Sequence, residues 1–241
     1  MKRGENPEGE DLGRGRTPGD RHYRAYVGHP DDFDLIAAST FSLLATLGLR
    51  QSHRLIDIGC GSLRCGRLFI PYLNRGGYTG IEPERWLVEE GIAREVGGDL
   101  VRAKQPHFEF GSEPRKLEGF APFDFALAQS IFTHAGPDIV RGWLVGCKKA
   151  LAPHGALLAT FIEGDGAPAD GWHYPDCIEY PVEFLEREAQ RAGLELRTLD
   201  WKHPRQRWAL FGNEGFDFAW LDAGALTWNR AFAREAGRGG T

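Results

Sequence analysis

RLIDIGCGSLRCG, residues 54–66, has the pattern of a buried strand, a glycine-rich turn and the first residues of a helix. Its strand part is apolar from Leu55 to Ile58 except for Asp57, which stands two positions before the first glycine. Gly59 and Gly61 allow the backbone to turn tightly and to approach a ligand where a Cβ atom would clash. Amides at the start of the helix would face a negatively charged group of that ligand. The stretch therefore predicts a binding site directly after a strand.

The pattern around this stretch predicts an α/β protein. From residue 53 onward, short apolar runs alternate with amphipathic stretches, which is typical of βα units and a mainly parallel sheet. The last two expected strands follow each other across His203, Pro204 and Arg205, a connection too short for a crossover helix, so they should pair antiparallel. We expect a Rossmann-like, seven-stranded, mostly parallel sheet with an antiparallel final strand and helices on both faces. The strands are expected at residues 54–58, 77–82, 107–110, 123–128, 155–162, 194–201 and 206–212.

Helix boundaries can be located from capping and helix-breaking residues. Asp31 and Asp32 can cap a helix whose apolar side chains recur at helical spacing up to Gly48. Proline is favoured in the first turn of a helix and glycine just past its end. Three further helices are therefore expected to open at Pro83, Pro137 and Pro181, the last of them ending at Gly193.

The length of 241 residues suits one α/β domain with short extensions. Residues 1–22 combine glycine, proline and both charge signs with few large apolar side chains, so we expect a disordered tail there. The domain itself is expected over residues 23–213, with an N-terminal covering helix. Residues 214–241 are expected to form a partly helical extension, with a helix around Thr227 to Glu235.

The composition argues against several classes of protein. A net charge of -5 and a pI near 5.9 give no general attraction to nucleic-acid phosphates. No apolar run approaches the roughly 18 residues that a membrane-spanning helix needs, and the start lacks an apolar signal segment. The four cysteines have no metal-binding spacing. We expect a cytoplasmic protein without a membrane partner, a nucleic-acid partner or a metal; the oligomeric state is left open.

Two kinds of cofactor fit a glycine-rich turn after a strand. Gly59 and Gly61 match the first two positions of a dinucleotide-binding fingerprint, but Arg64 occupies the third, where close helix packing requires glycine. Asp57 would place a negative charge beside a pyrophosphate, whereas it suits the cationic amino group of a methionine moiety. The pattern therefore favours S-adenosylmethionine over NAD as the cofactor.

A second carboxylate ends the second expected strand. Glu82 follows Asp57 by 25 residues, near the roughly 20-residue offset at which an acidic side chain reaches ribose hydroxyls in such folds. It can also cap the helix that Pro83 opens, and both roles can hold together. We expect Glu82 to bind the ribose.

Four segments carry a family resemblance. They are similar, in order and spacing, to the successive motifs of class I S-adenosylmethionine-dependent methyltransferases, particularly bacterial ones acting on small molecules. The resemblance spans about residues 30–212. The segments are DIGCGSLRCGRLFIPYL (57–73), YTGIEPERWL (78–87), FDFALAQSIFTH (123–134) and LAPHGALLATF (151–161).

The resemblance implies positions for the cofactor. Asp57 and Gly59 would border its methionine part, Glu82 would bind its ribose, and the turn after the third strand, residues 110–112, would flank its adenine. The N-terminal segment with Tyr26 would cover it. Gln129 and Ser130, at the end of the fourth strand, would neighbour cofactor or substrate, or be strand-end polar groups with only a structural role. The expected cofactor-binding residues are Tyr26, Asp57, Gly59, Gly61, Ser62, Glu82, Pro83, Gly111, Ser112, Gln129 and Ser130.

Methyl transfer to a hydroxyl group needs alignment and one base. His134, just past the fourth strand, is the best-placed imidazole, although it could instead cap the next helix or brace the loop. The long segment from Glu163 to Tyr180 mixes aromatic residues with glycine, which suggests a substrate lid with His173 as a second candidate base, or a packed surface loop. These residues favour O-methylation.

The sequence thus predicts an S-adenosylmethionine-dependent methyltransferase that acts on a small molecule. The fourth strand ends in Ala128, Gln129 and Ser130 and lacks the Pro-Pro-aromatic ending that stacks a flipped base, which argues against a nucleic-acid acceptor. A non-catalytic module that binds S-adenosylmethionine or a partner through the same fold remains an alternative, and so does an NAD-dependent enzyme.

Overall fold

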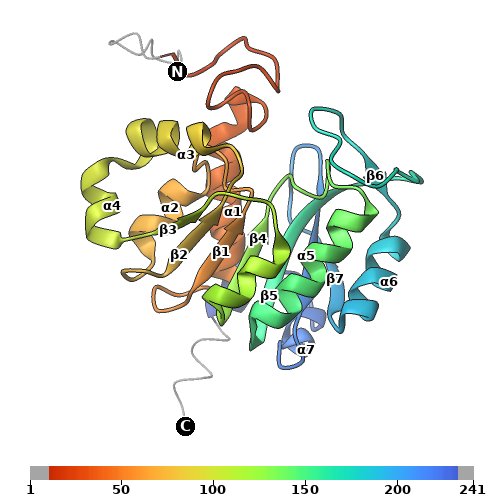
Figure 1. Ribbon diagram of the computed structural model, residues 1–241. Helices are drawn as coiled ribbons and strands as arrows, with labels where there is room; N and C mark the ends of the chain where they lie inside the picture. Colours follow the sequence, from red (N-terminus) through yellow and green to blue (C-terminus); the bar gives the residue numbers. More distant parts are fainter. Residues whose placement is uncertain (1–10, 233–241) are drawn as a thin grey trace.

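The computed structural model describes residues 11–232, which form one mixed β-sheet with helices on both faces (Figure 1). All seven expected strands are present, and the predicted fold class is confirmed. An additional two-residue strand, β6 (Glu179–Tyr180), pairs with the end of β5. The strand order is β3 (His107–Glu109), β2 (Tyr78–Ile81), β1 (Leu55–Ile58), β4 (Phe123–Ala128), β5 (Leu151–Glu163), β8 (Arg207–Gly212) and β7 (Glu195–Leu199).

Strand pairing brings three strand ends together at the centre of the sheet. β1 pairs in parallel with both β2 and β4, so that Asp57 lies opposite Gly80 on one side and Leu127 on the other. β8 runs antiparallel to β5 and β7, as the short connection before it predicted. The chain runs from β1 to β2 and β3 on one side and then crosses to β4 on the other side of β1, so a crevice is expected above the carboxyl ends of β1 and β4.

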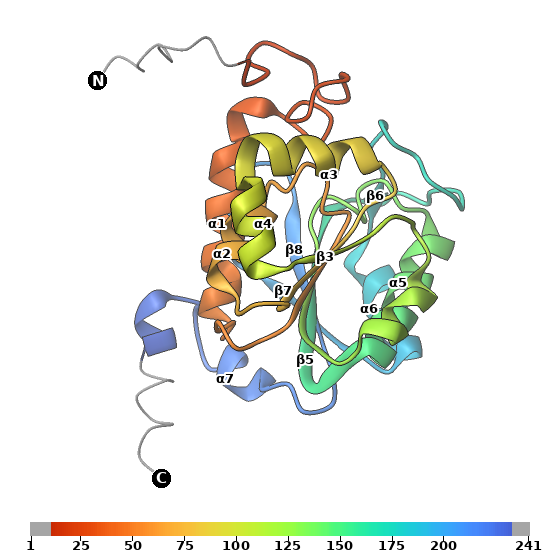
Figure 2. The same ribbon diagram turned by 60° about the vertical axis from the view of Figure 1, so that its left-hand side comes forward.

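The helices are divided between the two faces, as the view in Figure 2 shows. The first long helix, expected between Asp32 and Gly48, is observed at Phe33–Thr46. No helix within residues 11–232 combines the length and apolarity needed to cross a bilayer. One face carries α1 (Phe33–Thr46), α2 (Gly66–Tyr72), α3 (Arg85–Gly91), α4 (Gly98–Lys104) and α7 (Phe218–Asp222), and the other carries α5 (Pro137–Ala150) and α6 (Val182–Ala192).

Two apolar cores hold these layers together. Successive strand residues point to opposite faces, so Ala126 packs toward α5 and α6 whereas Phe125 packs toward α1 and α2. Leu157 and Leu158 of β5 divide in the same way. Because both faces of the central strands are buried, these strands are nearly continuous apolar runs, which is why the sequence located them.

Residues 11–22 belong to the expected disordered tail, but in the structure they form turns with local hydrogen bonds. The Asp11 carboxylate accepts hydrogen bonds from the Gly13 amide at 2.8 Å and from Arg16 at 2.7 Å, and the Gly19 amide donates to the Ala25 carbonyl at 2.9 Å. Local pairing of opposite charges orders a segment that composition alone marks as unable to fold. Residues 1–10 of the expected tail lie outside the described residues.

The C-terminal extension packs against the domain. Phe218 and Leu221 of α7 are buried in the core on the α1 side. Residues 228–232 form a helical turn, and the remainder of the helix expected around Thr227 to Glu235 lies outside the described residues.

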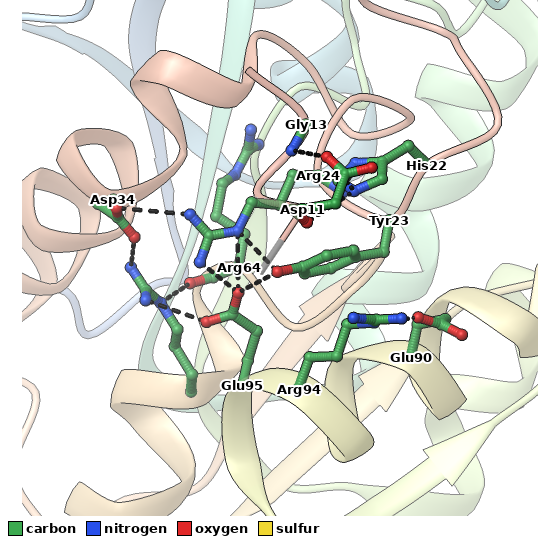
Figure 3. A network of polar contacts seen from close by, with 11 residues as sticks. Asp11, Gly13, His22, Tyr23, Arg24, Asp34, Arg64, Glu90, Arg94 and Glu95 are labelled. Carbon is green, nitrogen blue, oxygen red and sulfur yellow. Dashed lines mark hydrogen bonds and ion pairs between the residues drawn. The ribbon is translucent and has the colours of Figure 1, made fainter. Parts of the chain in front are cut away.

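A buried ion-pair cluster fastens the N-terminal segment to the domain (Figure 3). Glu95, in the π-helical turn η2 (Ile92–Val96), accepts hydrogen bonds from Arg24 at 2.6 Å and from Tyr23 at 3.1 Å. Its second oxygen accepts from Arg67 of α2 at 3.1 Å, and Arg67 also binds Asp34 of α1 at 2.6 Å. The Glu95 side chain is only 6% exposed. One carboxylate therefore joins three separate segments.

Glu95→Gln should destabilise the protein, because it leaves only the largely exposed Asp34 carboxylate to neutralise both Arg24 and Arg67. Breaking a buried ion pair costs about 3 kcal/mol or more. The measurement is the free energy of unfolding in urea. Glu90→Gln is the matched control, since Glu90 pairs with Arg94 at an exposed position and should cost about 0.5 kcal/mol or less. Equal losses in the two variants would contradict a structural role for the cluster.

Candidate functional site

A cavity of about 420 Å³ opens above the carboxyl ends of β1, β2 and β4. This volume is in the range of small-molecule sites, and the position is where open α/β sheets bind ligands. Its walls come from four parts of the chain: the N-terminal segment, the turns after β1 and β2, the residues after β4 with the loop before β6, and the β7–β8 turn.

The structure gathers most of the predicted site residues into this one cavity. Nine residues expected from the sequence line it: Tyr26, Asp57, Gly59, Gly61, Glu82, Pro83, Gln129, Ser130 and His134.

Four predicted residues do not line the cavity. Ser62 is fully buried behind the turn, where helix α3 packs closely on its backbone. Gly111 and Ser112 follow the short edge strand β3, and Gly111 packs beside Lys116 instead. His173 points away, with its Nε2 atom 2.9 Å from the Ala169 carbonyl oxygen. These four residues were expected at the site because they are near strand ends or in the expected lid segment in the sequence, but in the structure they lie away from the cavity.

The glycine-rich turn needs its glycines for two reasons. Gly59 and Gly61 have φ angles of 67° and 53°, in the left-handed region that favours glycine. A Cβ atom on Gly61 would also lie 2.6 Å from Val27, so the absence of a side chain lets the N-terminal segment close over the turn. The Gly61 amide donates to Glu82 at 2.9 Å, which links the ends of β1 and β2.

Glu82 is held firmly at the cavity wall. Its second carboxylate oxygen accepts a hydrogen bond from the Glu84 amide at 2.9 Å, so both oxygens bind backbone amides. Burial raises the pKa of Glu82, while these two hydrogen bonds oppose the shift. The side chain is therefore fixed in orientation, with the remaining lone pairs of its oxygens available to a ligand.

Asp57 lies deeper, on the cavity floor. It is only 3% exposed and accepts a hydrogen bond from the Tyr78 hydroxyl at 2.7 Å. Burial raises the pKa of Asp57 to about 7. A carboxylate placed in this way gains strongly from a cationic ligand group, because the unpaired charge is costly to bury.

Arg64 is a cavity residue that the sequence analysis used only to reject the dinucleotide fingerprint. Its guanidinium is buried and donates to the Val27 carbonyl at 2.8 Å and to Gln129 Oε1. Both of these partners are neutral, and no carboxylate within residues 11–232 forms an ion pair with Arg64. Burial lowers its pKa, and the nearby Asp57 charge opposes this shift only in part. This side chain is suited to bind an anion.

His134 is held in one tautomer. Its Nδ1 atom lies 2.8 Å from the Asp176 carbonyl oxygen, which can only accept, so Nδ1 carries the proton. Burial lowers the pKa of His134, so the ring is neutral near pH 7 and Nε2 keeps a lone pair. The ring packs against Tyr174 and Trp172, with centroids at 5.2 Å and 5.8 Å. A neutral imidazole with one available nitrogen can act as a base.

The β7–β8 turn adds residues that the sequence analysis assigned only to a connection or to the start of the last strand. His203, Arg205 and Gln206 line the cavity on the side of β4 and β5. Gln206 hydrogen-bonds with Ser130 at 2.9 Å. Ser130 has a φ of 62°, and its amide donates to Thr160 at 2.7 Å. A strained non-glycine residue held by several partners is typical of functional sites.

No protein-family model and no curated protein sequence matches the chain, but solved structures do. Magnesium protoporphyrin IX methyltransferase from Synechocystis PCC 6803, solved with S-adenosylhomocysteine, is 12% identical with a TM-score of 0.58; the match covers 76% of this chain and 84% of that one. The CcbJ methyltransferase from Streptomyces caelestis is 13% identical, with a TM-score of 0.56 and coverages of 77% and 91%. This chain has the class I methyltransferase fold.

A third match shows the same fold with another substrate. The 1,6-didemethyltoxoflavin-N1-methyltransferase from Burkholderia thailandensis, solved with its substrate and S-adenosylhomocysteine, is 19% identical with a TM-score of 0.54. The match covers 76% of this chain and 80% of that one. The resemblance seen in the sequence motifs is thus supported at the level of the fold.

Asp57→Asn should stabilise the ligand-free protein at pH 8. Burial raises the pKa of Asp57 from 3.8 to about 7, so the folded chain keeps a proton that the unfolded chain loses. Folding stability from this group therefore falls as the pH rises from about 4 to about 7, by up to about 4 kcal/mol at 1.4 kcal/mol per pKa unit. Urea unfolding at pH 5 and pH 8 should show that the advantage of Asp57→Asn shrinks at pH 5.

Asp99→Asn serves as the control for this prediction, because the Asp99 side chain is 94% exposed. Its stability relative to the natural sequence should change little between the two pH values. An Asp57→Asn advantage that is absent, or that does not vary with pH, would contradict the assigned cost of the buried charge.

Proposed function

We propose that this protein transfers a methyl group from S-adenosylmethionine to a small molecule. The proposal depends on one observation: Asp57 and Arg64 place opposite buried charges in the same cavity, and no ion pair joins these two side chains. An amino-acid moiety carries an ammonium and a carboxylate on one carbon and can neutralise both charges together. The solved structures of the same fold that contain S-adenosylhomocysteine support this choice of ligand.

The cavity residues suggest how the cofactor lies. Asp57 would bind the methionine ammonium, Arg64 its carboxylate, and Glu82 the ribose hydroxyls. Leu87 of α3 and the Tyr26 ring line the cavity on the Glu82 side, and we place the adenine against them, whereas the sequence analysis expected it beside Gly111 and Ser112. NAD has no amino-acid ammonium group that could bind Asp57. Its negatively charged phosphates would instead be repelled by the Asp57 carboxylate.

His134 is the proposed base for an acceptor hydroxyl. Its Nε2 would remove the hydroxyl proton while the acceptor oxygen bonds to the methyl carbon and the carbon–sulfur bond breaks, its electron pair going to sulfur. The positive sulfur supplies the activation, so the protein must mainly align the two groups and take the proton. The hydrogen bond to the Asp176 carbonyl keeps the ring oriented for this role.

Titration calorimetry tests the cofactor assignment. The protein should bind S-adenosylmethionine and S-adenosylhomocysteine and should not bind NAD. Glu82→Ala should weaken S-adenosylhomocysteine binding by about tenfold or more, because a buried charged hydrogen-bond acceptor is lost. Glu90→Ala, at an exposed position of the same helix region, should bind normally. Folded protein without affinity for either sulfur compound, or with equal affinity for NAD, would refute the proposal.

Turnover separates an enzyme from a binding module. In a screen of hydroxylated aromatic compounds with a methyl-labelled donor, His134→Asn should lower kcat by about 10²- to 10⁴-fold, the usual contribution of a general base. Asparagine can keep the hydrogen bond to the Asp176 carbonyl but offers no basic nitrogen, so S-adenosylhomocysteine affinity should be unchanged.

His173→Asn is the matched control, since His173 does not line the cavity and should keep full turnover. If His134→Asn also kept full turnover, His134 would not be the base. If the natural sequence bound the cofactor but methylated nothing in the screen, the binding-module alternative would be favoured.

A further inference from the structure

The cavity has two halves that differ in the charges of their lining side chains. Three carboxylates are among its lining residues, Asp57 in β1 and Glu82 and Glu84 just after β2, all on the half assigned to the cofactor. The half above β4 and β5 is lined by His203, Arg205 and other side chains without a carboxylate. An acceptor that lies in this half therefore meets hydrogen-bond donors and positive charge.

His203 presents a donor to the cavity. Its Nδ1 atom lies 3.0 Å from the Gln206 amide and 3.3 Å from the Arg205 amide. Both amides can only donate, so Nδ1 accepts and the proton of the neutral ring lies on Nε2. Burial, with Arg64 and Arg205 nearby, lowers the pKa of His203 to about 4, which keeps the ring neutral at pH 7.

The side-chain amide of Gln129 is a second hydrogen-bond donor, and it lies close to His203 Nε2. Gln129 Oε1 accepts from Arg64, and this bond fixes the orientation of the amide. Gln129 Nε2 therefore points the other way, donating to Ser130 at 2.7 Å and lying 3.5 Å from His203 Nε2. Two N–H groups therefore face each other at this distance with no hydrogen-bond acceptor from the described part of the chain between them. A negatively charged oxygen of a ligand could accept from both.

Arg205 supplies the positive charge beside these donors. Its Nη1 atom pairs with Asp32 at 2.8 Å, at the edge of the cavity. The other guanidinium nitrogens have no hydrogen-bond partner among residues 11–232, although the residue lines the cavity. Burial lowers the pKa of His203 and the Arg205 charge adds to this shift, with Asp32 opposing it; burial raises the pKa of Cys177 and the Arg205 charge opposes that rise. Both residues line the cavity, so the Arg205 charge acts within this half.

The remaining walls of this half are aromatic. Trp172 and Tyr174 both pack against the His134 ring, and Trp172 is 52% exposed. Tyr174 is anchored by donating its hydroxyl hydrogen to the Tyr26 carbonyl at 2.8 Å. Flat rings of this kind bind aromatic surfaces by stacking or edge contacts.

We propose that the acceptor is a small aromatic hydroxy acid. Arg205, with the N–H groups of His203 and Gln129, binds its carboxylate, the aromatic walls hold its ring, and its hydroxyl faces His134. This assignment of the substrate class depends on the proposed function. It makes Arg205 a specificity-determining residue of the β7–β8 turn.

The experiment uses the full chain saturated with S-adenosylhomocysteine, whose binding is measured first. The probes are 2-, 3- and 4-hydroxybenzoate, each paired with the matching hydroxybenzamide, which has the same shape but no charge. Calorimetry should show at least one acid binding about tenfold or more tightly than its amide. If S-adenosylhomocysteine itself fails to bind, the proposed function is wrong; if it binds and no acid is preferred over its amide, only the present inference is wrong.

Two matched variants assign the preference to Arg205. Arg205→Gln should remove the preference for the acid while leaving the affinities for the amide and for S-adenosylhomocysteine unchanged. Arg207→Gln removes the same charge two residues later, at a similarly exposed position paired with Glu163 outside the cavity, and should keep the preference. An unchanged acid preference in Arg205→Gln would overturn the assignment. So would weaker S-adenosylhomocysteine binding, which would place the cofactor carboxylate at this turn.

Discussion

The cavity depends on two buried charges that the fold does not pair with each other. Asp57 accepts a hydrogen bond from a tyrosine hydroxyl, and Arg64 donates to a carbonyl and an amide oxygen, while no ion pair joins the two side chains. A protein selected for stability alone would pair these groups or replace them with apolar side chains, since unpaired buried charge is costly. Both instead remain beside an open cavity, where a ligand with a positive and a negative group can neutralise them. The stability lost in the ligand-free chain becomes affinity for such a ligand.

The N-terminal segment completes this arrangement by closing one side of the cavity. Gly61 lacks the side chain that would collide with Val27, and the Val27 carbonyl accepts one of the hydrogen bonds of Arg64. The segment is held by Glu95, whose two oxygens bind Arg24 and Arg67. The glycine-rich turn therefore leaves room for the segment that covers the cavity.

The sequence predicted those features that depend on local pattern and on the rules of parallel sheets. All central strands were located because burial on both faces makes them apolar, and Asp57, Glu82 and Gln129 were placed together because parallel strands end at one edge. The β7–β8 turn was not recognised as part of the cavity, since Gln129 and His203 are 74 residues apart and meet only through the antiparallel pairing of β5 with β8. The order of residues 11–22 was missed for a similar reason, because composition does not show which charges become partners.

Two histidines line the half of the cavity above β4 and β5, and their backbone contacts determine which ring nitrogen carries the proton. At His134 the Nδ1–H group donates a hydrogen bond to a carbonyl oxygen, so Nε2 is left as an acceptor. At His203 two amides donate to Nδ1, so Nε2 becomes a donor. Burial lowers the pKa of both rings, which keeps each in a single neutral form near pH 7. Neighbouring backbone groups thus determine that one imidazole can take a proton and the other can hold an anion. Two identical side chains thereby present a hydrogen-bond acceptor at one position and a donor at the other.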